Sequence, residues 1–568
     1  MRILLLAHSF NSLTQRLWVE LEARGHEISL ELDVNDATTA QAVALFKPQL
    51  LIAPFLKRAI PESVWRALPC WVVHPGIVGD RGPSALDWAV LEGEARWGVT
   101  VLQANDEFDA GDILAAHEFT MRAATKGSLY RLEVAEATVA AVCEALERHA
   151  HGVTPTPLAD WQPAPRSRAR PVCRQSDRAI DWARDTTASV LARIRSADGT
   201  PGLLDASGEV PLKLHDAHPE GALRGAPGAW IARRDEALCR ATADGAVWIG
   251  SLSQANDPDH PFKRPAALVL PELAAHLPEA PLALDAAPGA PTWRELAYAE
   301  AEGVGVLHFA FYNGAMSTAQ CRRLAAALAW AKARPTQVLV LAGGPDFWSN
   351  GLHLNVIEGA ADPAAESMAN IEAMDDAVLE ILTATDQLTL AALQGNAGAG
   401  GVFLALAADL VWARSGVVLN PHYKGMGNLY GSEYWTYALP RRVGAEGAAR
   451  ITAQRLPMGT HEARALGLID DAFGAAPADF LHEALRRARQ LATDPALPER
   501  LRAKAARRAA DEQAKPLAAY RAEELARMSL NFHGFDPSYH VARSHFVRKS
   551  GKARTPSWLA RHRHPRGV

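Results

Sequence analysis

The sequence has few cysteines, and their arrangement argues against the common cysteine-based sites. Only five occur in 568 residues, at positions Cys70, Cys143, Cys173, Cys239 and Cys321. The number is odd and no C-x-x-C pair is present, so neither a disulfide framework nor a zinc ribbon is indicated. We therefore expect a protein of a reducing compartment, the cytoplasm, with no metal site.

Long apolar segments are also scarce. The longest uncharged run, residues 387–408, contains Gln394, Asn396 and a cluster of glycines, and it is interpreted as a buried segment of a globular core. The amino-terminal MRILLLAHSF has one basic residue and a short apolar run without a small-residue cleavage site. This pattern predicts a buried strand, and export is not indicated.

Neither sign of charge is in large excess. Lys and Arg number 59 and Asp and Glu 64, giving a formal net charge of -5. No global basic field therefore exists to bind nucleic acid or an anionic membrane, and small-molecule partners at local sites are expected. With 48% hydrophobic and 22% charged residues, the chain is an ordinary globular protein, long enough for several domains.

The order of predicted elements indicates a multidomain α/β protein. Apolar runs alternate with amphipathic stretches over the first 150 residues, a βαβ pattern typical of a parallel sheet that binds ligands at the carboxyl ends of its strands. Proline-rich stretches near residues 149–170 and 278–291 read as linkers. The predicted domains are an α/β domain (1–160), a small β-rich domain (171–275), a second α/β domain (290–475) and a helical extension with a basic tail (476–568).

The tail from Arg543 to Val568 has eight basic residues and no acidic one. It is interpreted as a solvated or partner-packed end. Contact with ligand phosphates is the alternative.

A histidine and an aspartate follow two strands of the first domain. His74 comes directly after the apolar WVV, and Asp109 lies in the loop after the strand VTVLQ. A carboxylate that faces an imidazole can fix the tautomer of the ring and stabilise its charged form. We predict that His74 and Asp109 form a general acid and base pair.

The segment around these residues, HPGIVGDRGPSALDWAVLEGEARWGVTVLQANDEFDAGDIL, resembles the 10-formyltetrahydrofolate-dependent formyltransferases. The segment beginning DRAIDWARD is similar to the start of the carboxyl-terminal, OB-like domain of methionyl-tRNA formyltransferases, so the resemblance covers roughly residues 1–270. It implies a Rossmann-like first domain in which His74 and Asp109 move protons as formyl leaves the folate N10, with Asp112 structural. It further implies folate-binding positions at Asn11, Ser12, Arg81 and Gly82, although ordinary turn capping explains the loop of Asn11 and Ser12 equally well.

One position departs from the formyltransferase pattern. The family has a catalytic asparagine two residues before the histidine, where this sequence has Val72. Loss of one donor to an oxyanion typically costs about 2.7 to 4 kcal/mol. A thiol, with a pKa of about 8.5 when free, is a better nucleophile near neutral pH than a protonated amine, so the formyl acceptor is expected to differ.

A glycine-rich turn marks the second α/β domain. GNAGAGG (395–401) lies between the strand TLAAL and a helix-like segment, where free backbone N–H groups can bind an oxyanion. Together with FWSNGLHL upstream, it resembles the crotonase (enoyl-CoA hydratase/isomerase) family over roughly residues 290–475. The resemblance implies that the N–H groups of Leu352 and Gly400 bind a thioester carbonyl, with Met316 and Ser317 beside the coenzyme A.

The two glutamates that hydratases use correspond here to Phe403 and His422, so hydration of a double bond is not expected. Tyr423 and Glu433, in the following loop, are instead predicted as acid and base on a thioester.

The two halves in one chain resemble a family of NiFe-hydrogenase maturation factors. The resemblance implies transfer of formyl from 10-formyltetrahydrofolate to coenzyme A and cleavage of formyl-CoA to CO, with the hydrogenase large-subunit precursor as a candidate partner. A formyltetrahydrofolate hydrolase, another acyl-CoA enzyme, and a non-catalytic scaffold that binds folate or coenzyme A remain alternatives, and Val72 is the feature that favours the scaffold.

Overall fold

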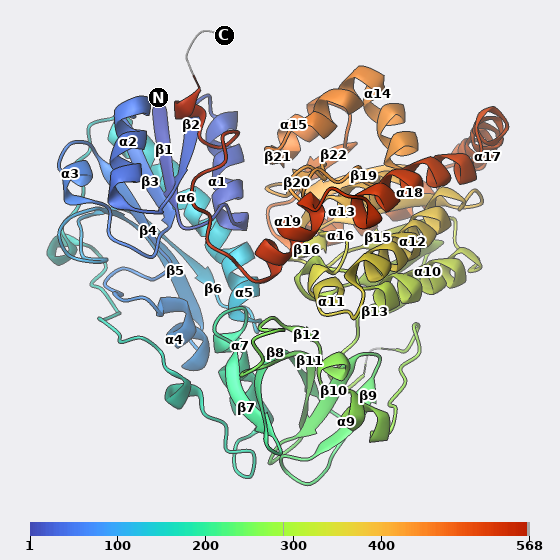
Figure 1. Cartoon of the computed structure of the whole chain (residues 1–568), viewed down its shortest axis with the longest axis horizontal. Coiled ribbons are helices and arrows are strands. Elements are labelled where there is room, and N and C mark those ends of the chain that lie inside the picture. Colours follow the sequence, from blue (N-terminus) through green and yellow to red (C-terminus); the bar gives the residue numbers. More distant parts are fainter. Residues whose placement is uncertain (288, 565–568) are drawn as a thin grey trace. The chain divides into compact units, whose positions relative to one another are not determined.

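The computed structural model describes residues 1–287 and 289–564, which form two compact units (Figure 1). One unit contains residues 1–278 together with the chain from Gly551 onward, and the other contains residues 279–550. The second unit is therefore inserted, in sequence, near the end of the first. Within the described ranges no helix is both long enough and apolar enough to span a membrane.

The first unit begins with a six-stranded sheet in the order β2-β1-β3-β4-β5-β6. The four strands from β2 to β4 run parallel, whereas β5 and β6 are antiparallel to their neighbours. This confirms the predicted parallel α/β arrangement and adds an antiparallel edge. The strands are β1 (Arg2–Ala7), β2 (Glu27–Leu32), β3 (Leu50–Phe55), β4 (Cys70–His74), β5 (Arg96–Gln103) and β6 (Ile113–Thr120).

Helices that follow these strands cover the sheet. Asn11 and Asn35 each cap a helix by accepting a hydrogen bond from a backbone N–H in its first turn, which fixes where α1 and α2 begin. The helices are α1 (Ser12–Ala23), α2 (Asp36–Phe46), α3 (Glu62–Trp65), α4 (Ala85–Leu91), α5 (Lys126–Leu129), a π-helical turn (Tyr130–Val134) and α6 (Ala135–Ala150).

A small β-rich domain follows the proline-rich linker, as predicted. Its strands form an antiparallel sheet in the order β7-β8-β11-β10-β9, with β12 paired to β11, and apolar side chains of α7 and α8 pack in its core. Its elements are α7 (Thr187–Ala197), β7 (Leu203–Ser207), β8 (Val210–Glu220), β9 (Trp230–Arg234), β10 (Ala237–Ala241), β11 (Ala246–Gln254), β12 (Arg264–Pro265), α8 (Ala266–Val269) and α9 (Pro271–His276).

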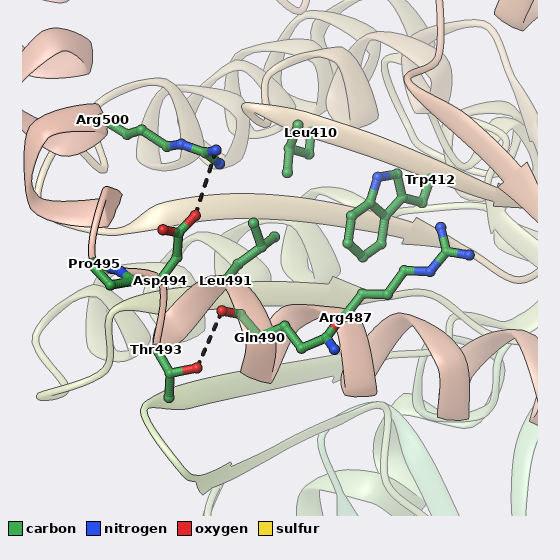
Figure 2. A pocket seen from close by; sticks show the side chains of 9 residues that line it. All are labelled: Leu410, Trp412, Arg487, Gln490, Leu491, Thr493, Asp494, Pro495 and Arg500. Atoms are coloured by element: carbon green, nitrogen blue, oxygen red, sulfur yellow. Dashed lines mark hydrogen bonds and ion pairs between the residues drawn. The ribbon is translucent and has the colours of Figure 1, made fainter.

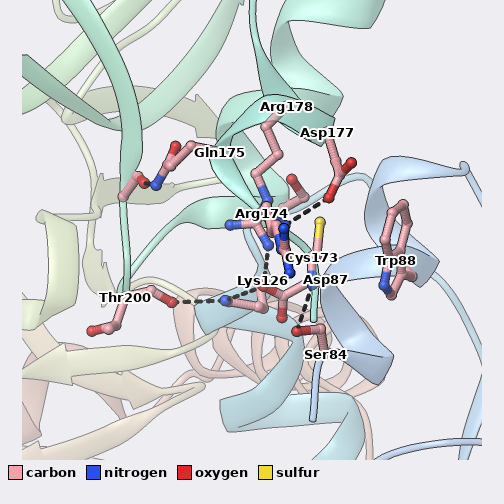
Figure 3. Close-up of polar contacts among 12 residues, drawn as sticks. Ser84, Asp87, Trp88, Lys126, Cys173, Arg174, Gln175, Asp177, Arg178 and Thr200 are labelled. Atoms are coloured by element: carbon pink, nitrogen blue, oxygen red, sulfur yellow. Dashed lines mark hydrogen bonds and ion pairs between the residues drawn. The ribbon is translucent and has the colours of Figure 1, made fainter. Parts of the chain in front are cut away.

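A charge cluster around a buried arginine joins this small domain to the first sheet domain (Figure 3). Arg178, which is fully buried, forms an ion pair with Asp87 of α4, and Lys126 of α5 binds the same carboxylate at 3.0 Å. Lys126 also donates to the carbonyl of Thr200 at 2.8 Å. Because one carboxylate serves two cations from different segments, these contacts fix the two domains to each other.

The second unit is built on a six-stranded sheet in the order β13-β14-β15-β17-β19-β22 and a four-stranded sheet in the order β16-β18-β20-β21. All strands of the larger sheet are parallel except β13. The strands are β13 (Leu296–Ala301), β14 (Val304–Phe309), β15 (Val338–Ala342), β16 (Phe347–Ser349), β17 (Leu388–Leu393), β18 (Asn396–Gly398), β19 (Leu410–Arg414), β20 (Val418–Asn420), β21 (Met458–Gly459) and β22 (Asp471–Phe473).

Helices pack on both faces of the larger sheet, as its two separate apolar clusters show. One cluster includes side chains of α10, α12, α13 and α18, and the other includes side chains of α16. The helices are α10 (Thr318–Lys332), α11 (Leu354–Glu358), α12 (Pro363–Leu382), α13 (Gly400–Leu406), α14 (Trp435–Ala453), α15 (Thr460–Ala465), α16 (Pro477–Ala492), α17 (Leu497–Ala514), α18 (Leu517–His533) and α19 (Ser538–Val547).

The basic tail packs against the edge strand β2 of the first unit. The N–H of Leu30 donates to the carbonyl of Leu559 at 3.0 Å, and the N–H of Leu32 donates to Oγ1 of Thr555 at 2.7 Å. Glu31 is fully buried and contacts His562 at 2.9 Å and Arg563 at 2.7 Å. The stretch predicted as one extension (476–568) is thus divided between the two units, and its last four residues lie outside the described ranges.

Candidate active sites

In the first unit, His74 lies at the end of β4 between two carboxylates. Its Nδ1 is 3.4 Å from Oδ1 of Asp109, and its Nε2 is 2.9 Å from Oδ2 of Asp80. His74 and Asp80 are buried, whereas Asp109 is partly exposed. The predicted pair of His74 and Asp109 is therefore brought together, and Asp80 is a partner that the sequence reading did not single out.

Asp109 does not reach His74 from the end of a neighbouring parallel strand, as the predicted parallel sheet would have placed it. β5 runs antiparallel to β4, with His74 opposite Thr100 and Trp71 opposite Gln103, so the end of β5 points away from His74. The loop after β5 folds back, and Asp109 adopts a left-handed φ of 53° within it. Gly111 permits this return, because a Cβ there would lie 1.7 Å from the carbonyl oxygen of Gln103.

The two carboxylates favour the charged form of His74. Burial alone disfavours the imidazolium, but the hydrogen bonds and charges of Asp109 and Asp80 outweigh it and raise the pKa of His74 to about 9. Burial likewise disfavours the charged form of Asp109, yet its pKa is lowered by His74 and by the N–H of Gly82, which is 3.3 Å from Oδ2. At neutral pH the site holds an imidazolium between carboxylates.

The predicted folate-binding residues occupy the rim of this site and the loop after β1. Asn11 caps α1, accepting from the N–H of Thr14 at 3.0 Å, and Ser12 is the first residue of that helix. Arg81 pairs with Glu107 at 2.8 Å, and the N–H of Gly82 points to Asp109. Capping by Asn11 is observed, and folate binding by all four residues stays a prediction.

Val72, which replaces the asparagine of the formyltransferases, is half-buried in the middle of β4. Its cross-strand partners are Ala53 on β3 and Leu102 on β5. Since both partners are apolar, neither of them supplies the donor that an asparagine would.

In the second unit, the loops that carry Leu352 and Gly400 lie against each other. A Cβ built on Gly351 would be 3.4 Å from the backbone nitrogen of Gly400, and Ala399 has a left-handed φ of 47° where α13 begins. Leu352 forms an isolated bridge with Met316. The two N–H groups predicted to bind a carbonyl oxygen therefore come from neighbouring loops.

The side chains of Met316 and Ser317 have structural roles. Met316 is fully buried in the core of the unit, and its sulfur accepts from Oγ of Ser349 at 3.1 Å. Ser317 caps α10 by accepting from the N–H of Gln320 at 3.2 Å. Contact of these two residues with coenzyme A stays a prediction.

Glu433 and Tyr423 form a buried pair beside Gly400. The Tyr423 hydroxyl donates to Oε2 of Glu433 at 2.5 Å, and a Cβ added to Gly400 would lie 2.0 Å from Oε1 of Glu433. Only a glycine at position 400 therefore leaves room for this carboxyl group. The ring of Tyr423 stacks on Phe403, with centroids 5.2 Å apart.

Two further buried carboxyl groups surround the loop of Glu433, and the sequence reading missed both. Asp375 of α12 accepts from the N–H of Glu433 at 2.8 Å and from Oγ of Ser432 at 2.9 Å. Glu524 of α18 accepts from the N–H of Tyr434 at 2.9 Å. The helical extension therefore contributes a residue to this region, although nothing in its local sequence distinguishes Glu524 from a surface glutamate.

These carboxyl groups have strongly perturbed titrations. Burial, followed by the charge of Asp375, raises the pKa of Glu433 to about 8. Burial is also the main cause that raises the pKa of Asp375 and of Glu524 to about 7 each. Burial and the charge of Glu433 raise the pKa of Tyr423 well above its ordinary value, so Tyr423 is a neutral donor.

His422 and Phe403 stand where hydratases have glutamates. Phe403 is fully buried. Burial, followed by the charge of Arg455, lowers the pKa of His422 to about 4, so its imidazole is neutral. Neither residue supplies the carboxylate that addition of water requires.

An open pocket lies elsewhere in the second unit, between β19 and the helices α16 and α17 (Figure 2). Within it Arg500 pairs with Asp494 at 3.5 Å. Glu433 and Gly400 are not among its lining residues, so it is separate from the carboxyl cluster. It is lined by Leu410, Trp412, Arg487, Gln490, Leu491, Thr493, Asp494, Pro495 and Arg500.

Comparison with known families agrees with this division of the chain. Residues 28–146 match the formyl transferase family, and residues 173–261 match the formyl transferase carboxyl-terminal domain. Residues 302–532 match the enoyl-CoA hydratase/isomerase family.

Individual relatives extend the similarity to nearly the whole chain. The chain is 54% identical over 565 residues to the hydrogenase maturation factor HoxX of Bradyrhizobium diazoefficiens, covering 99% of this chain and 97% of that protein. The crystal structure of HypX from Aquifex aeolicus in complex with tetrahydrofolic acid has 47% identity and a TM-score of 0.96, with both chains fully covered. The methionyl-tRNA formyltransferase of Desulfotalea psychrophila is 29% identical over 197 residues, which is 32% of this chain and 59% of that protein.

Proposed function

Because the chain belongs to the family of hydrogenase maturation factors that includes HoxX and HypX, we propose that it makes the carbon monoxide ligand of the NiFe site by two reactions in series. Formyl passes from 10-formyltetrahydrofolate to the thiol of coenzyme A in the first unit. The resulting formyl-CoA is then cleaved to CO and coenzyme A in the second unit. The observation that carries the proposal is the pair of Tyr423 and Glu433 against Gly400, in a crotonase-like unit that lacks both hydratase glutamates.

In the first reaction the thiolate attacks the formyl carbon, and the bond from that carbon to folate N10 breaks. The thiol proton must end on N10, so the site has to hold and move one proton. His74, charged at neutral pH between Asp80 and Asp109, is suited to stabilise the tetrahedral oxyanion and to give its own proton to N10, and the proton that the thiol has lost then restores the imidazolium. The tetrahydrofolic acid in the Aquifex aeolicus HypX structure supports a folate substrate for this unit.

The replacement of asparagine by Val72 fits a thiol acceptor. A thiolate is a strong nucleophile near neutral pH, so its attack needs less stabilisation than attack by an amine. We therefore assign coenzyme A, and not an amine, as the formyl acceptor. All five cysteines are free and buried, as in proteins of a reducing compartment, and we place this chemistry in the cytoplasm.

In the second reaction the formyl-CoA carbonyl oxygen binds the N–H groups of Leu352 and Gly400. The C–H bond breaks, its proton goes to the Glu433 carboxylate, and its electron pair stays on carbon as the lone pair of CO. The C–S bond breaks, sulfur leaves as a thiolate, and the proton then passes to the thiolate. No oxidant or reductant is needed, and Tyr423, which stays protonated, positions the carboxylate.

The test is CO release, trapped by reduced haemoglobin, from the full chain supplied with coenzyme A and 10-formyltetrahydrofolate. We expect CO from the wild type and none from His74→Ala or Glu433→Gln. Added formyl-CoA should restore CO release in His74→Ala but not in Glu433→Gln, because only the second site acts on formyl-CoA.

Val72, which lacks the donor of the asparagine it replaces, supports one other function. In that function the protein is a scaffold that binds folate and coenzyme A without catalysis and docks on the hydrogenase large-subunit precursor. If the wild type binds both ligands but gives neither CO nor formate, the scaffold is correct. Formate without CO would indicate a hydrolase.

A further inference from the structure

The loop that carries Glu433 is held by two carboxylates from helices distant in the sequence. Asp375 accepts from the N–H of Glu433, and Glu524 accepts from the N–H of Tyr434. Glu433 and Tyr434 have left-handed φ values of 61° and 56°, an unfavourable conformation for residues other than glycine. The two carboxylates therefore stabilise a strained turn that places Glu433 beside Gly400.

Ser432 connects the two carboxylates. Its hydroxyl lies 2.9 Å from Oδ2 of Asp375 and 3.3 Å from Oε2 of Glu524, and its N–H donates to Oε2 of Glu433 at 3.1 Å. Ser432, Asp375 and Glu524 are all fully buried. A substitution of Asp375 or Glu524 should therefore shift the position of Glu433, because the hydrogen bonds that connect these residues are buried away from water.

The charges around Glu433 are mostly negative. Arg521 lies 3.7 Å from Oδ2 of Asp375 and also pairs with the exposed Asp376 at 2.7 Å, and Lys515 acts on Glu524 through its charge. The titratable groups that act on Glu433 are Tyr423 on its own loop, Asp375 on α12, Cys321 on α10 and Glu524 on α18, whereas Arg521 acts on Asp375. Because Cys321 and Tyr423 are held neutral by burial, the charge that acts on Glu433 comes from the two carboxylates.

We infer that Asp375 and Glu524 are positioning residues that, through Ser432 and their negative charge, orient Glu433 and make its carboxylate a stronger base than an isolated buried glutamate in the same place. This inference rests on the proposed function, in which Glu433 receives the formyl proton. A base is most effective when its pKa is close to the working pH, and like charges move a carboxyl group toward that range. The carboxyl groups of the cluster interact, so their protons are lost in steps that belong to the cluster as a whole.

The experiment compares Asp375→Asn with Asp376→Asn in the full chain. The amide that Asp375→Asn introduces would keep an oxygen to accept from the Glu433 N–H but would remove the charge, whereas Asp376 is an exposed neighbour on the same helix that binds the same arginine. CO release from formyl-CoA should rise with pH through about 8 in the wild type. The midpoint should fall by about one unit or more in Asp375→Asn and stay in place in Asp376→Asn.

A second readout does not depend on CO release. The infrared band of protonated carboxyl groups, assigned to Glu433 by its loss in Glu433→Gln, should persist to higher pH in the wild type than in Asp375→Asn or Glu524→Gln. If the wild type releases no CO but its infrared band still titrates at higher pH than that of the variants, the proposed function is wrong and the electrostatic coupling stands. CO release with an unshifted midpoint and an unshifted band in both variants would overturn the inference itself.

Discussion

His74 differs from an ordinary histidine of a strand end because each of its ring nitrogens faces a carboxylate. Asp109 lies on the open side and Asp80 on the buried side, where Ser167 also donates to Oδ1 of Asp80 at 2.9 Å. An acidic group on the buried nitrogen fixes ring orientation and stabilises the imidazolium. We therefore expect Asp80 to act through the imidazole of His74.

Asp80→Asn tests this role. Because the amide has no charge, the pKa of His74 should fall and less imidazolium should be present at neutral pH. We expect formyl transfer to coenzyme A to slow on the order of 10²-fold, with folate affinity little changed. Single-turnover formation of formyl-CoA across pH measures this, and an unchanged rate with an unchanged pH profile would contradict it.

The raised pKa of His74 also predicts a pH-dependent stability. A group whose pKa rises from 6.5 in the unfolded chain to about 9 in the folded chain stabilises the fold fully below pH 6.5, and this contribution is lost as the pH rises through 9. The contribution is on the order of 3 kcal/mol at most. The opening free energy of the β4 amides, measured by hydrogen exchange, should differ most between wild type and Asp80→Asn at pH 6. The two values should converge above pH 9, and a difference that does not change with pH would contradict the raised pKa of His74.

At the scale of elements, α17 is attached to its unit by an unusual anchor. Among its residues only Leu497 and Lys504 are buried. The Lys504 ammonium binds Oδ2 of Asp409 at 2.6 Å and the carbonyl of Gln387 at 2.7 Å, and it also donates to the carbonyl of Ala384. The Lys504 ammonium thus anchors α17 to its unit, whereas apolar side chains anchor the neighbouring helix α16.

Lys504→Met should loosen this helix. It removes a buried cation and leaves Asp409 without its charge partner, a change that typically costs about 3 to 5 kcal/mol. Hydrogen exchange of the α17 amides should become faster, and that of the α12 amides should not change. Lys515→Met is the matched control, since Lys515 pairs with Glu523 at an exposed site where removal of an ion pair has little effect; an equal effect of both variants would argue against the anchor.

At the scale of the whole molecule, the chain passes from the first unit to the second and back again. The return segment completes the edge of the first sheet, because Leu30 and Leu32 of β2 find their acceptors in the tail. Trp558 of the tail also contacts Phe10, edge to face, in the loop after β1. His562 and Arg563 contact the buried Glu31, so the tail packs on its own chain, whereas the sequence was interpreted as a solvated or partner-packed end.

Truncation after Ser550 should therefore damage the first unit, although it removes only the end of the chain. The amides of Leu30 and Leu32 would lose their acceptors and Glu31 its cations. An unmade hydrogen bond at a buried group costs about 1 to 3 kcal/mol, so exchange at these amides should quicken tenfold to hundredfold. Exchange in β15 of the second unit serves as the internal control, and unchanged protection of Leu30 would contradict the docking.

Local features of the sequence predicted the α/β and β-rich domains, the strand before His74 and the glycine-rich turn where α13 begins, because apolar periodicity and turn residues act over a few positions. The formyltransferase-like and crotonase-like character of the two parts was inferred from their resemblance to known families. The sequence also predicted Tyr423 and Glu433, which lie in one short loop, as acid and base in a unit whose hydratase glutamates are replaced by Phe403 and His422.

The carboxylates that surround each candidate base, and the place where the tail packs, could be found only from the packing of distant segments. Asp375 and Glu433 lie 58 positions apart, and Glu31 and Thr555 lie 524 apart. No local pattern distinguishes Asp375, Glu524 or Glu31 from surface acids, because their burial follows from the packing of whole helices and strands against one another. The chemistry of a buried carboxyl group depends on that packing, so it is decided only when the chain has folded.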